Sequence, residues 1–406
     1  MEDDPNLLAP LRKRVCVDAG CEWQFEFVNN VMREIFSEIP AQKLRGLRTL
    51  SDILKTNLDV SRILGSQNVV PTIAALLETH WARDPLLAAQ ILALLDQLYE
   101  QEPLLLWNCN IVARCMPFLS TSNASTCILV MRLFTNMCAE GKDFVEVMLS
   151  GDCMTNLKCV GNAIAFSAWP APPYTQSVRK MFLDCVCSAG KCLDAERVHI
   201  SLLPLAPAVA ALSRLTPEAL PAFCHVCRTC AKEVMDMIDE KMWNAIADLV
   251  GREEHQLLAV NTIGEFMRAG HAIVRRVKNF EIVKGMLNGK RDEDRQCAIR
   301  FMQGVAECGA EGVAMIVRES VFGIVARVDP HDCGKFAFYG RDYARFCVTV
   351  LDAATDLQIV EISKQCNITR YIGFLMSVPG QDLLVDLSCA ATRVLRALVL
   401  SNRGSN

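Results

Sequence analysis

The most constraining feature of the sequence is a helix–glycine–helix signature that runs from residue 131 to residue 144. Leu133, Phe134 and Met137 recur at the spacing that places side chains on one face of a helix. Gly141 stands where a helix end favours a residue that tolerates positive φ, and Phe144 follows in the next apolar run. Because the signature returns several times along the chain, it predicts a repeat protein whose units bury their apolar faces against their neighbours.

Each predicted unit consists of a short, a medium and a long helix, and the medium helix is the easiest to recognise. We expect it near residues 69–77 and again at Ile111–Leu119, Cys153–Val160, Pro207–Leu215, Met242–Val250, Phe280–Leu287, Val321–Val328 and Ile368–Met376. The spacing averages roughly 40 residues, the period of HEAT and armadillo repeats. Several long helices are expected to end at a glycine: Gly141, Gly190, Gly270 and Gly309. Since strand-like alternation is weak throughout, the pattern predicts an all-α solenoid of about eight repeats.

The predicted solenoid occupies residues 41–400, and other segments flank or interrupt it. Residues 1–40 are interpreted as an N-terminal cap region with a helix over Gln24–Ile39 that Pro40 closes. Two stretches rich in proline or glycine, near residues 163–176 and 329–343, are predicted to be loop insertions. Residues 401–406 are predicted to form a disordered tail.

Composition excludes several classes of function. The formal net charge of −4 and the sequence pI near 5.9 argue against general nucleic-acid binding, which requires a basic surface. Charges interrupt every apolar run, so we expect no membrane-spanning segment, and the acidic N-terminus indicates no secretory signal peptide. The 20 cysteines are therefore expected to be mostly free thiols buried in the core.

Signatures of catalysis and of metal binding are weak. Phosphate loops, nucleophile elbows and zinc-protease motifs are missing from the sequence, so we predict that the chain is not an enzyme. Cys224, Cys227 and Cys230 are similar in spacing to the start of an iron–sulfur ligand run, but the position of the next ligand is Val234. On a helix the three cysteines drift round one side, as small buried residues do, so we favour a structural role and predict no metal and no cofactor.

Several phrases resemble the armadillo repeats of importin-α. Residues 68–77 (NVVPTIAALL) resemble the opening of the medium helix in that family. Residues 132–141 (RLFTNMCAEG) have an asparagine and a glycine in the register of the family's long helix, and residues 261–266 (NTIGEF) resemble a later unit. The resemblance covers nearly all of the chain and implies a right-handed superhelical α-solenoid.

In that family, tryptophan and asparagine ladders on the long helices line a concave groove for basic nuclear-localisation signals. The register places the tryptophan positions on Ala93, Arg132, Met181, Cys224, Asn261, Arg300 and Phe346, and the asparagine positions on Gln97, Asn136, Cys185, Arg228, Glu265, Gly304 and Val350. From this resemblance we expect the binding residues to be Gln97, Arg132, Asn136, Asn261 and Glu265. Asn136 and Gln97 would hold the peptide backbone, and Glu265 would pair with a cation.

The resemblance implies an adaptor for protein import into the nucleus, found in the cytoplasm and the nucleus. Its partners would be a protein or peptide cargo, importin-β and an export carrier, with neither nucleic acid nor membrane involved. One alternative is an armadillo or HEAT scaffold for cytoskeletal, trafficking or chaperone assemblies, which would use its convex face or the loops that contain Trp169 and His331. A metal- or redox-linked protein that uses Cys224, Cys227 and Cys230 is the third alternative.

Overall fold

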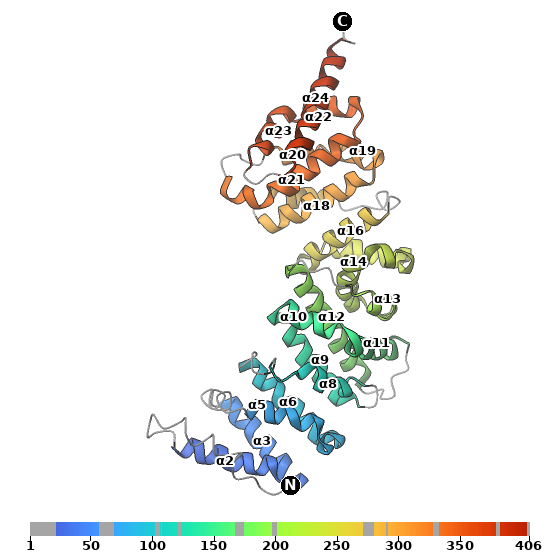
Figure 1. Cartoon of the computed structure of the whole chain (residues 1–406). Helices are drawn as coiled ribbons and strands as arrows, with labels where there is room; N and C mark the ends of the chain where they lie inside the picture. The colour runs from blue at the N-terminus through green and yellow to red at the C-terminus, as the bar shows by residue number, and fades with distance from the viewer. Residues whose placement is uncertain are drawn as a thin grey trace. The chain divides into compact units, whose positions relative to one another are not determined.

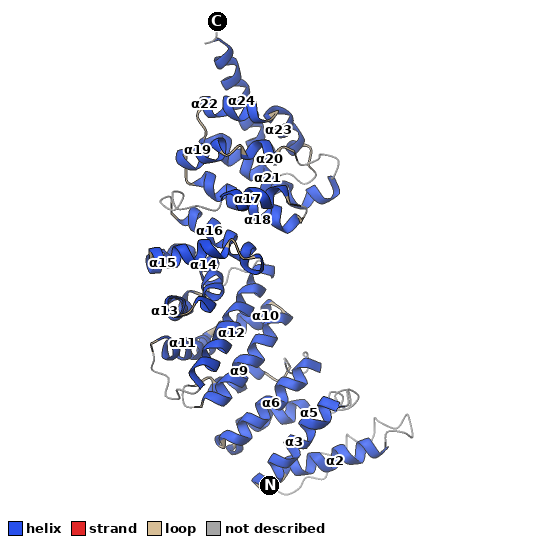
Figure 2. Cartoon of the chain, turned by 180° about the vertical axis from the view of Figure 1, so that it is seen from behind, coloured by secondary structure: helices blue, strands red, loops and turns tan. Residues whose placement is uncertain are grey.

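The computed structural model describes residues 22–56, 69–101, 106, 108–120, 123–166, 174–196, 201–270, 280–289, 291–327, 333–378 and 382–403. This described part is all-helical and contains no strand (Figure 2). Within the same ranges, every helix is too short or too polar to cross a lipid bilayer. The chain divides into two compact units, Met1–Leu212 and Ser213–Asn406, and α13 (Ala206–Leu215) contains the boundary.

Unit 1 contains a series of long helices with shorter helices between them (Figure 1). The helices are α2 (Glu22–Phe36), α3 (Pro40–Thr56), α5 (Val69–Ala75), α6 (Pro85–Gln101), α8 (Ile111–Cys115), α9 (Ala124–Met137), α10 (Lys142–Met148), α11 (Gly151–Ala165) and α12 (Thr175–Glu196). The long helices α3, α6, α9 and α12 pack side by side in chain order. The shorter α5 and α8 form a second row against them, and α11 packs on α12. This arrangement is that of an α-solenoid.

Unit 2 repeats the same plan. Its helices are α14 (Leu220–Val234), α15 (Glu240–Leu249), α16 (Gln256–Ala269), α17 (Phe280–Asn288), α18 (Asp292–Glu307), α19 (Ala310–Arg318), α20 (Val321–Val325), α21 (Cys333–Ala353), α22 (Asp356–Gln365), α23 (Ile368–Met376) and α24 (Leu384–Arg403). Here α14, α16, α18, α21 and α24 each pack against the next, and shorter helices such as α17, α20 and α23 lie against that row.

Local signals explain several helix ends. The Asn123 side chain accepts hydrogen bonds from the backbone N–H groups of Ser125 and Thr126 and so caps the start of α9. Gly141 has a φ of 131° and Gly309 a φ of 82°, so both ends use the conformational freedom that the sequence predicted for them. Gly270 directly follows α16, as predicted.

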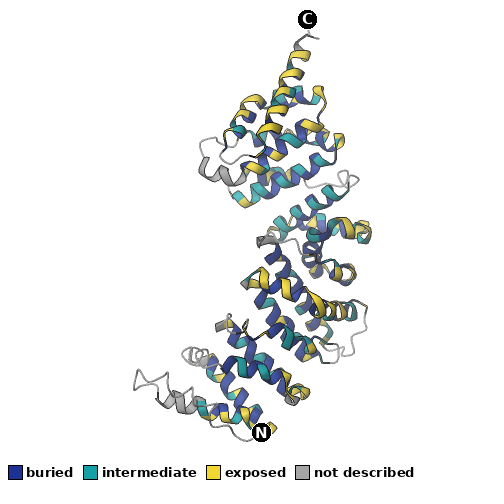
Figure 3. Cartoon of the chain, in the orientation of Figure 1, coloured by how far each residue is buried: buried dark blue, intermediate teal, exposed yellow. Residues whose placement is uncertain are grey.

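The core lies between the helix rows and is strongly apolar (Figure 3). One large aromatic side chain from most long helices is fully buried; these residues are Phe134, Phe182, Phe223, Phe266, Phe301 and Phe346. Within each unit, neighbouring helices bury their apolar faces against one another, so a repeat is stable only beside its neighbours.

Some predicted boundaries were wrong. Pro40 opens α3 instead of closing the preceding helix, because the first turn of a helix does not use the N–H that proline lacks. Gly190 lies buried inside α12, where close packing replaces its expected role as a stop. The first predicted insertion is helical at both ends, since α11 runs to Ala165 and α12 starts at Thr175.

The second insertion and the tail also differ from expectation. Helix α21 begins at Cys333, so most of residues 329–343 is helical, and α24 continues to Arg403 within the predicted tail. Helix propensity disfavours glycine by only about 1 kcal/mol, so the two glycines of residues 329–343 do not prevent a helix that packs on its neighbours. Trp169 and His331, which the scaffold alternative would use, lie outside the described residues.

Candidate functional site

Two of the three predicted site residues of unit 1, Arg132 and Asn136, meet around one buried carboxylate. Helices α6 and α9 pack side by side and bring Asp96 against Arg132 and Asn136. An Arg132 guanidinium nitrogen (Nη2) lies 2.5 Å from Asp96 Oδ2, and Asn136 Nδ2 donates to Asp96 Oδ1 at 3.1 Å. The Asp96 side chain is only 3% exposed, whereas that of Arg132 is 47% exposed. Arg132 therefore covers an acidic group and presents its other face to solvent.

Polar side chains also connect α6 to α3, the long helix on its other side. Ser51 Oγ on α3 donates to Gln97 Oε1 on α6 at 2.8 Å, across 46 residues of sequence. On the other side, the Tyr99 hydroxyl donates to the backbone carbonyl of Asn136 at 3.2 Å. Gln97, Arg132 and Asn136 thus belong to one polar row, residues 51, 96, 97, 132 and 136, which we call the unit 1 row.

The unit 1 row contains Asp96, a residue that sequence reasoning missed. It sits in the apolar run Leu94-Leu95-Asp96, where a charge is unexpected, and that contrast is the signal that identifies it. Burial raises the pKa of the Asp96 carboxyl, and Glu100 adds to this, while Arg132 and Asn136 oppose it. Burial has the largest effect, so the Asp96 carboxyl loses its proton less readily than the carboxyl of an exposed aspartate.

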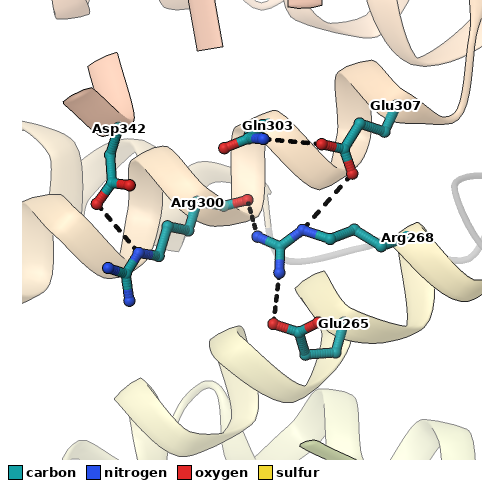
Figure 4. Close-up of polar contacts among 6 residues, drawn as sticks. All are labelled: Glu265, Arg268, Arg300, Gln303, Glu307 and Asp342. Atoms are coloured by element: carbon teal, nitrogen blue, oxygen red, sulfur yellow. Dashed lines mark hydrogen bonds and ion pairs between the residues drawn. The ribbon is translucent and has the colours of Figure 1, made fainter. Parts of the chain in front are cut away.

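The two predicted residues of unit 2, Asn261 and Glu265, both lie on α16 and are half-buried. Glu265 accepts a hydrogen bond from the Arg268 guanidinium one helical turn later (Figure 4). These two residues are in a different unit from Gln97, Arg132 and Asn136.

Arg268 connects α16 to α18. Its Nη2 donates to the backbone carbonyl of Arg300 at 3.1 Å, and its Nε lies 3.6 Å from Glu307 Oε2. Glu307 also accepts from Gln303 Nε2 at 2.8 Å (Figure 4). Sequence reasoning did not single out Arg268.

The contacts then pass from α18 to α21. Arg300 Nε lies 3.1 Å from Asp342 Oδ2 (Figure 4). Gln296 Nε2 donates to the same oxygen at 2.9 Å. We call residues 265, 268, 296, 300, 303, 307 and 342 the unit 2 row. Like the unit 1 row, it joins long helices by side chains about 40 residues apart in sequence.

Most other positions of the family register are packed rather than open. The buried ones are Cys185, Cys224, Gly304, Phe346 and Val350. Gly304 permits close approach of two helices, because a Cβ at this position would lie 2.9 Å from the carbonyl oxygen of Gly264. The buried ladder positions of unit 2 therefore serve contacts between helices, whereas Glu265 and Arg300 belong to the unit 2 row.

The cysteine triplet on α14 is part of the core. Cys224, Cys227 and Cys230 are all buried, and Cys230 Sγ donates to the carbonyl of Val226 at 3.0 Å. At Cys230 the backbone leaves helical values, with φ −152° and ψ 45°, so the helix is kinked there. Among the described residues, no group of three or more histidine, cysteine or acidic side chains could hold a metal ion.

The cysteine thiols differ in burial and should therefore differ in their reactivity toward an alkylating reagent. Cys159 and Cys389 are exposed, whereas burial raises the pKa of Cys127 and of Cys153 to about 12. Because the thiolate is the reactive form, we expect iodoacetamide at a pH of about 8 to label Cys159 and Cys389 rapidly and the two buried thiols only after unfolding. Peptide mapping by mass spectrometry of native and urea-unfolded protein measures this. Labelling of native Cys127 as fast as that of Cys389 would contradict the packing described.

The raised pKa of Asp96 predicts a pH-dependent contribution to stability. The native state holds this proton at pH values where the unfolded chain, with a pKa near 3.8, has released it. The stability that Asp96 contributes therefore falls as pH rises from the unfolded pKa through the folded one. Urea unfolding of wild type and Asp96→Asn between about pH 4 and pH 7 should show wild type gaining relative to the variant toward acid pH. A difference that is constant or grows with pH would refute this.

Comparisons with known proteins give information about the fold only. No family model matches the chain, and no curated protein matches it. The crystal structure of an engineered protein is similar with a TM-score of 0.66 and 12% sequence identity, covering 90% of this chain and 88% of that chain. A second engineered protein covers 70% of this chain and 97% of that one at 10% identity, with a TM-score of 0.36 that supports no conclusion. The first similarity supports an all-helical, solenoid-like fold.

Proposed function

We propose that the chain is a non-enzymatic helical-repeat adaptor that binds a peptide segment of another protein along the polar rows of its long helices. On this proposal its units are armadillo-type repeats, about eight in a right-handed superhelix, similar to importin-α. The observation that supports it best is the unit 1 row, where Asp96, Arg132, Asn136 and Gln97 gather on adjacent long helices. The cargo would be a basic signal recognised in the cytoplasm for transport to the nucleus, with importin-β and an export carrier as further partners.

The contacts of the unit 1 row suggest how a basic peptide would be received. The Arg132 guanidinium already occupies the buried carboxylate of Asp96, as a cargo arginine would do. A cargo cation must therefore displace Arg132 or bind beside it, against repulsion from a like charge. Asn136 donates one amide hydrogen to Asp96, and its amide also has a second hydrogen and an oxygen for a peptide backbone.

Binding of a fluorescent basic signal peptide, measured by anisotropy at several salt concentrations, tests the proposal. We expect affinity that falls with salt, a weaker complex for Asn136→Ala, and a tighter complex for Arg132→Ala, because the latter frees Asp96 and removes a like charge. Asn244→Ala is the matched control, since Asn244 is an exposed residue of α15. Absence of binding at low ionic strength by wild type and by Arg132→Ala would reject the proposal.

The second candidate is a repeat scaffold for cytoskeletal, trafficking or chaperone assemblies that binds no nuclear signal. The packed register positions of unit 2, including Phe346 and Val350, favour it because they leave that unit without an open ladder. Affinity capture under physiological salt distinguishes the two candidates. Recovery of importin-β or an export carrier supports the first, and recovery of scaffold partners that survive Asn136→Ala supports the second.

A further inference from the structure

Helix α24 has two faces of different character. Leu387, Ala390, Val394 and Ala397 are buried where α24 packs on α21, α22 and α23. The Arg393 guanidinium fixes this position by donating to the carbonyls of Leu351 and Ala354, each at 2.8 Å, near the end of α21. The buried face is therefore ordinary solenoid packing, and it sets the rotation of the whole helix.

The opposite face of α24 is exposed and apolar. Val385 is 75% exposed, Leu395 52% and Val399 51%. Together with the exposed Ser388 and Thr392, they follow the alternating spacing of three and four residues that defines a coiled-coil seam. Valine and threonine occupy positions seven residues apart, at 385, 392 and 399, and the pattern extends over two heptads. We call these five residues the α24 seam.

The seam lies where the solenoid would place another helix. Within unit 2, α16, α18 and α21 each pack between two long helices, whereas α24 packs on α21 and the described residues leave its seam uncovered. A narrow stripe with heptad spacing fits the side of one more helix and does not fit a flat surface. Exposed apolar patches of this kind mark interaction sites in soluble proteins.

We propose that the α24 seam is a self-association surface that pairs in an antiparallel manner with the same seam of a second copy. In the antiparallel arrangement Val385 of one copy lies opposite Leu395 of the other, and Ser388 lies opposite Thr392. The same residues are therefore buried on both sides. This pairing is closed by a two-fold axis, so it forms dimers and not filaments.

Charge favours the antiparallel direction. The exposed acid of the first turn is Asp386, and Arg396 is an exposed base in the second half of the helix. Antiparallel helices place the acidic part of one beside the basic part of the other, and their dipoles also oppose. Parallel helices would place like charges side by side.

The seam is short, so the dimer should be weak. One face of a helix of this length buries less area than the roughly 1,600 Å² of a standard interface. We therefore expect a dissociation constant in the range of about 1 to 100 μM. Sedimentation velocity over a concentration range of about a hundredfold around this value should show a monomer–dimer equilibrium.

Substitutions that add charge to the seam test its part in the dimer. We expect Val385→Lys to raise the dimer dissociation constant at least about tenfold, because it places an unpaired ammonium against Leu395 of the second copy. Val147→Lys is the matched control, since Val147 is a 43% exposed valine of α10 in the other unit. Both positions are exposed in the monomer, so circular dichroism should show unchanged helix content.

The cysteine beside the seam reports on direction. In the antiparallel register, Cys389 of each copy flanks the same side of the seam at nearly the same level, so a short bismaleimide should join two copies. Cys389→Ser should abolish this cross-link, and Cys159→Ser should leave it intact. A monomer at every concentration, a dimer indifferent to Val385→Lys, or cross-linking that does not need Cys389 would each overturn the proposal.

Discussion

Gly312→Ala is expected to destabilise unit 2 by about 3 kcal/mol, near the upper end of the cost of overpacking a core. Gly312 is buried in the first turn of α19, and a Cβ there would lie 1.7 Å from the carbonyl oxygen of Val305 on α18. Because the obstacle is backbone rather than the end of a flexible side chain, one helix must move away from the other. Chemical unfolding followed by circular dichroism measures the loss as a lower midpoint.

A second glycine supplies the control for this substitution. Gly285 lies inside α17, it is exposed, and a Cβ there would meet nothing within 4 Å. Gly285→Ala should therefore stabilise the protein by about 0.5–1 kcal/mol, because alanine loses less backbone freedom than glycine on forming a helix. Equal effects of the two substitutions would show that α19 does not approach α18 as closely as described.

The sequence predicted the helices well because their apolar periodicity is local. The medium helix predicted at Ile368–Met376 is confirmed with the same boundaries. Predictions from single residues were less reliable, since proline and glycine act according to context. Pro40 begins a helix and Gly190 lies within one, because the first turn tolerates proline and packing offsets the propensity of glycine.

The candidate site was predictable only in part. A ladder inferred along single helices identified Arg132 and Asn136, which both contact Asp96, and Gln97, which instead accepts a hydrogen bond from Ser51 on α3. It could not identify Asp96 or Arg268, because their roles depend on which residues of the next helix lie opposite them. The angle between successive long helices sets that choice, and it arises from packing between residues about 40 positions apart. Whether these residues bind a peptide stays a prediction.

Phe134→Ala is expected to destabilise unit 1 by about 3–5 kcal/mol, the typical cost of emptying a buried aromatic site. Phe134 on α9 is 0% exposed, and its ring meets that of Phe144 on α10 edge to face at a centroid distance of 5.6 Å. Alanine would remove this contact and leave a cavity between the two helices. Urea unfolding at neutral pH, monitored by helix content, gives the change in unfolding free energy.

The loss should extend to the unit 1 row because Phe134 and Asn136 belong to the same turn of α9. A repeat without its buried aromatic holds the helix less firmly, so the distance from Asn136 to Asp96 should vary more. We therefore expect Phe134→Ala to weaken binding of the basic peptide as well, whereas Phe134→Leu retains most of the volume and costs less than about 1.5 kcal/mol. Phe166→Ala is the matched control, because Phe166 is 63% exposed. A loss of stability from Phe166→Ala as large as that from Phe134→Ala would show that burial of Phe134 does not cause the effect.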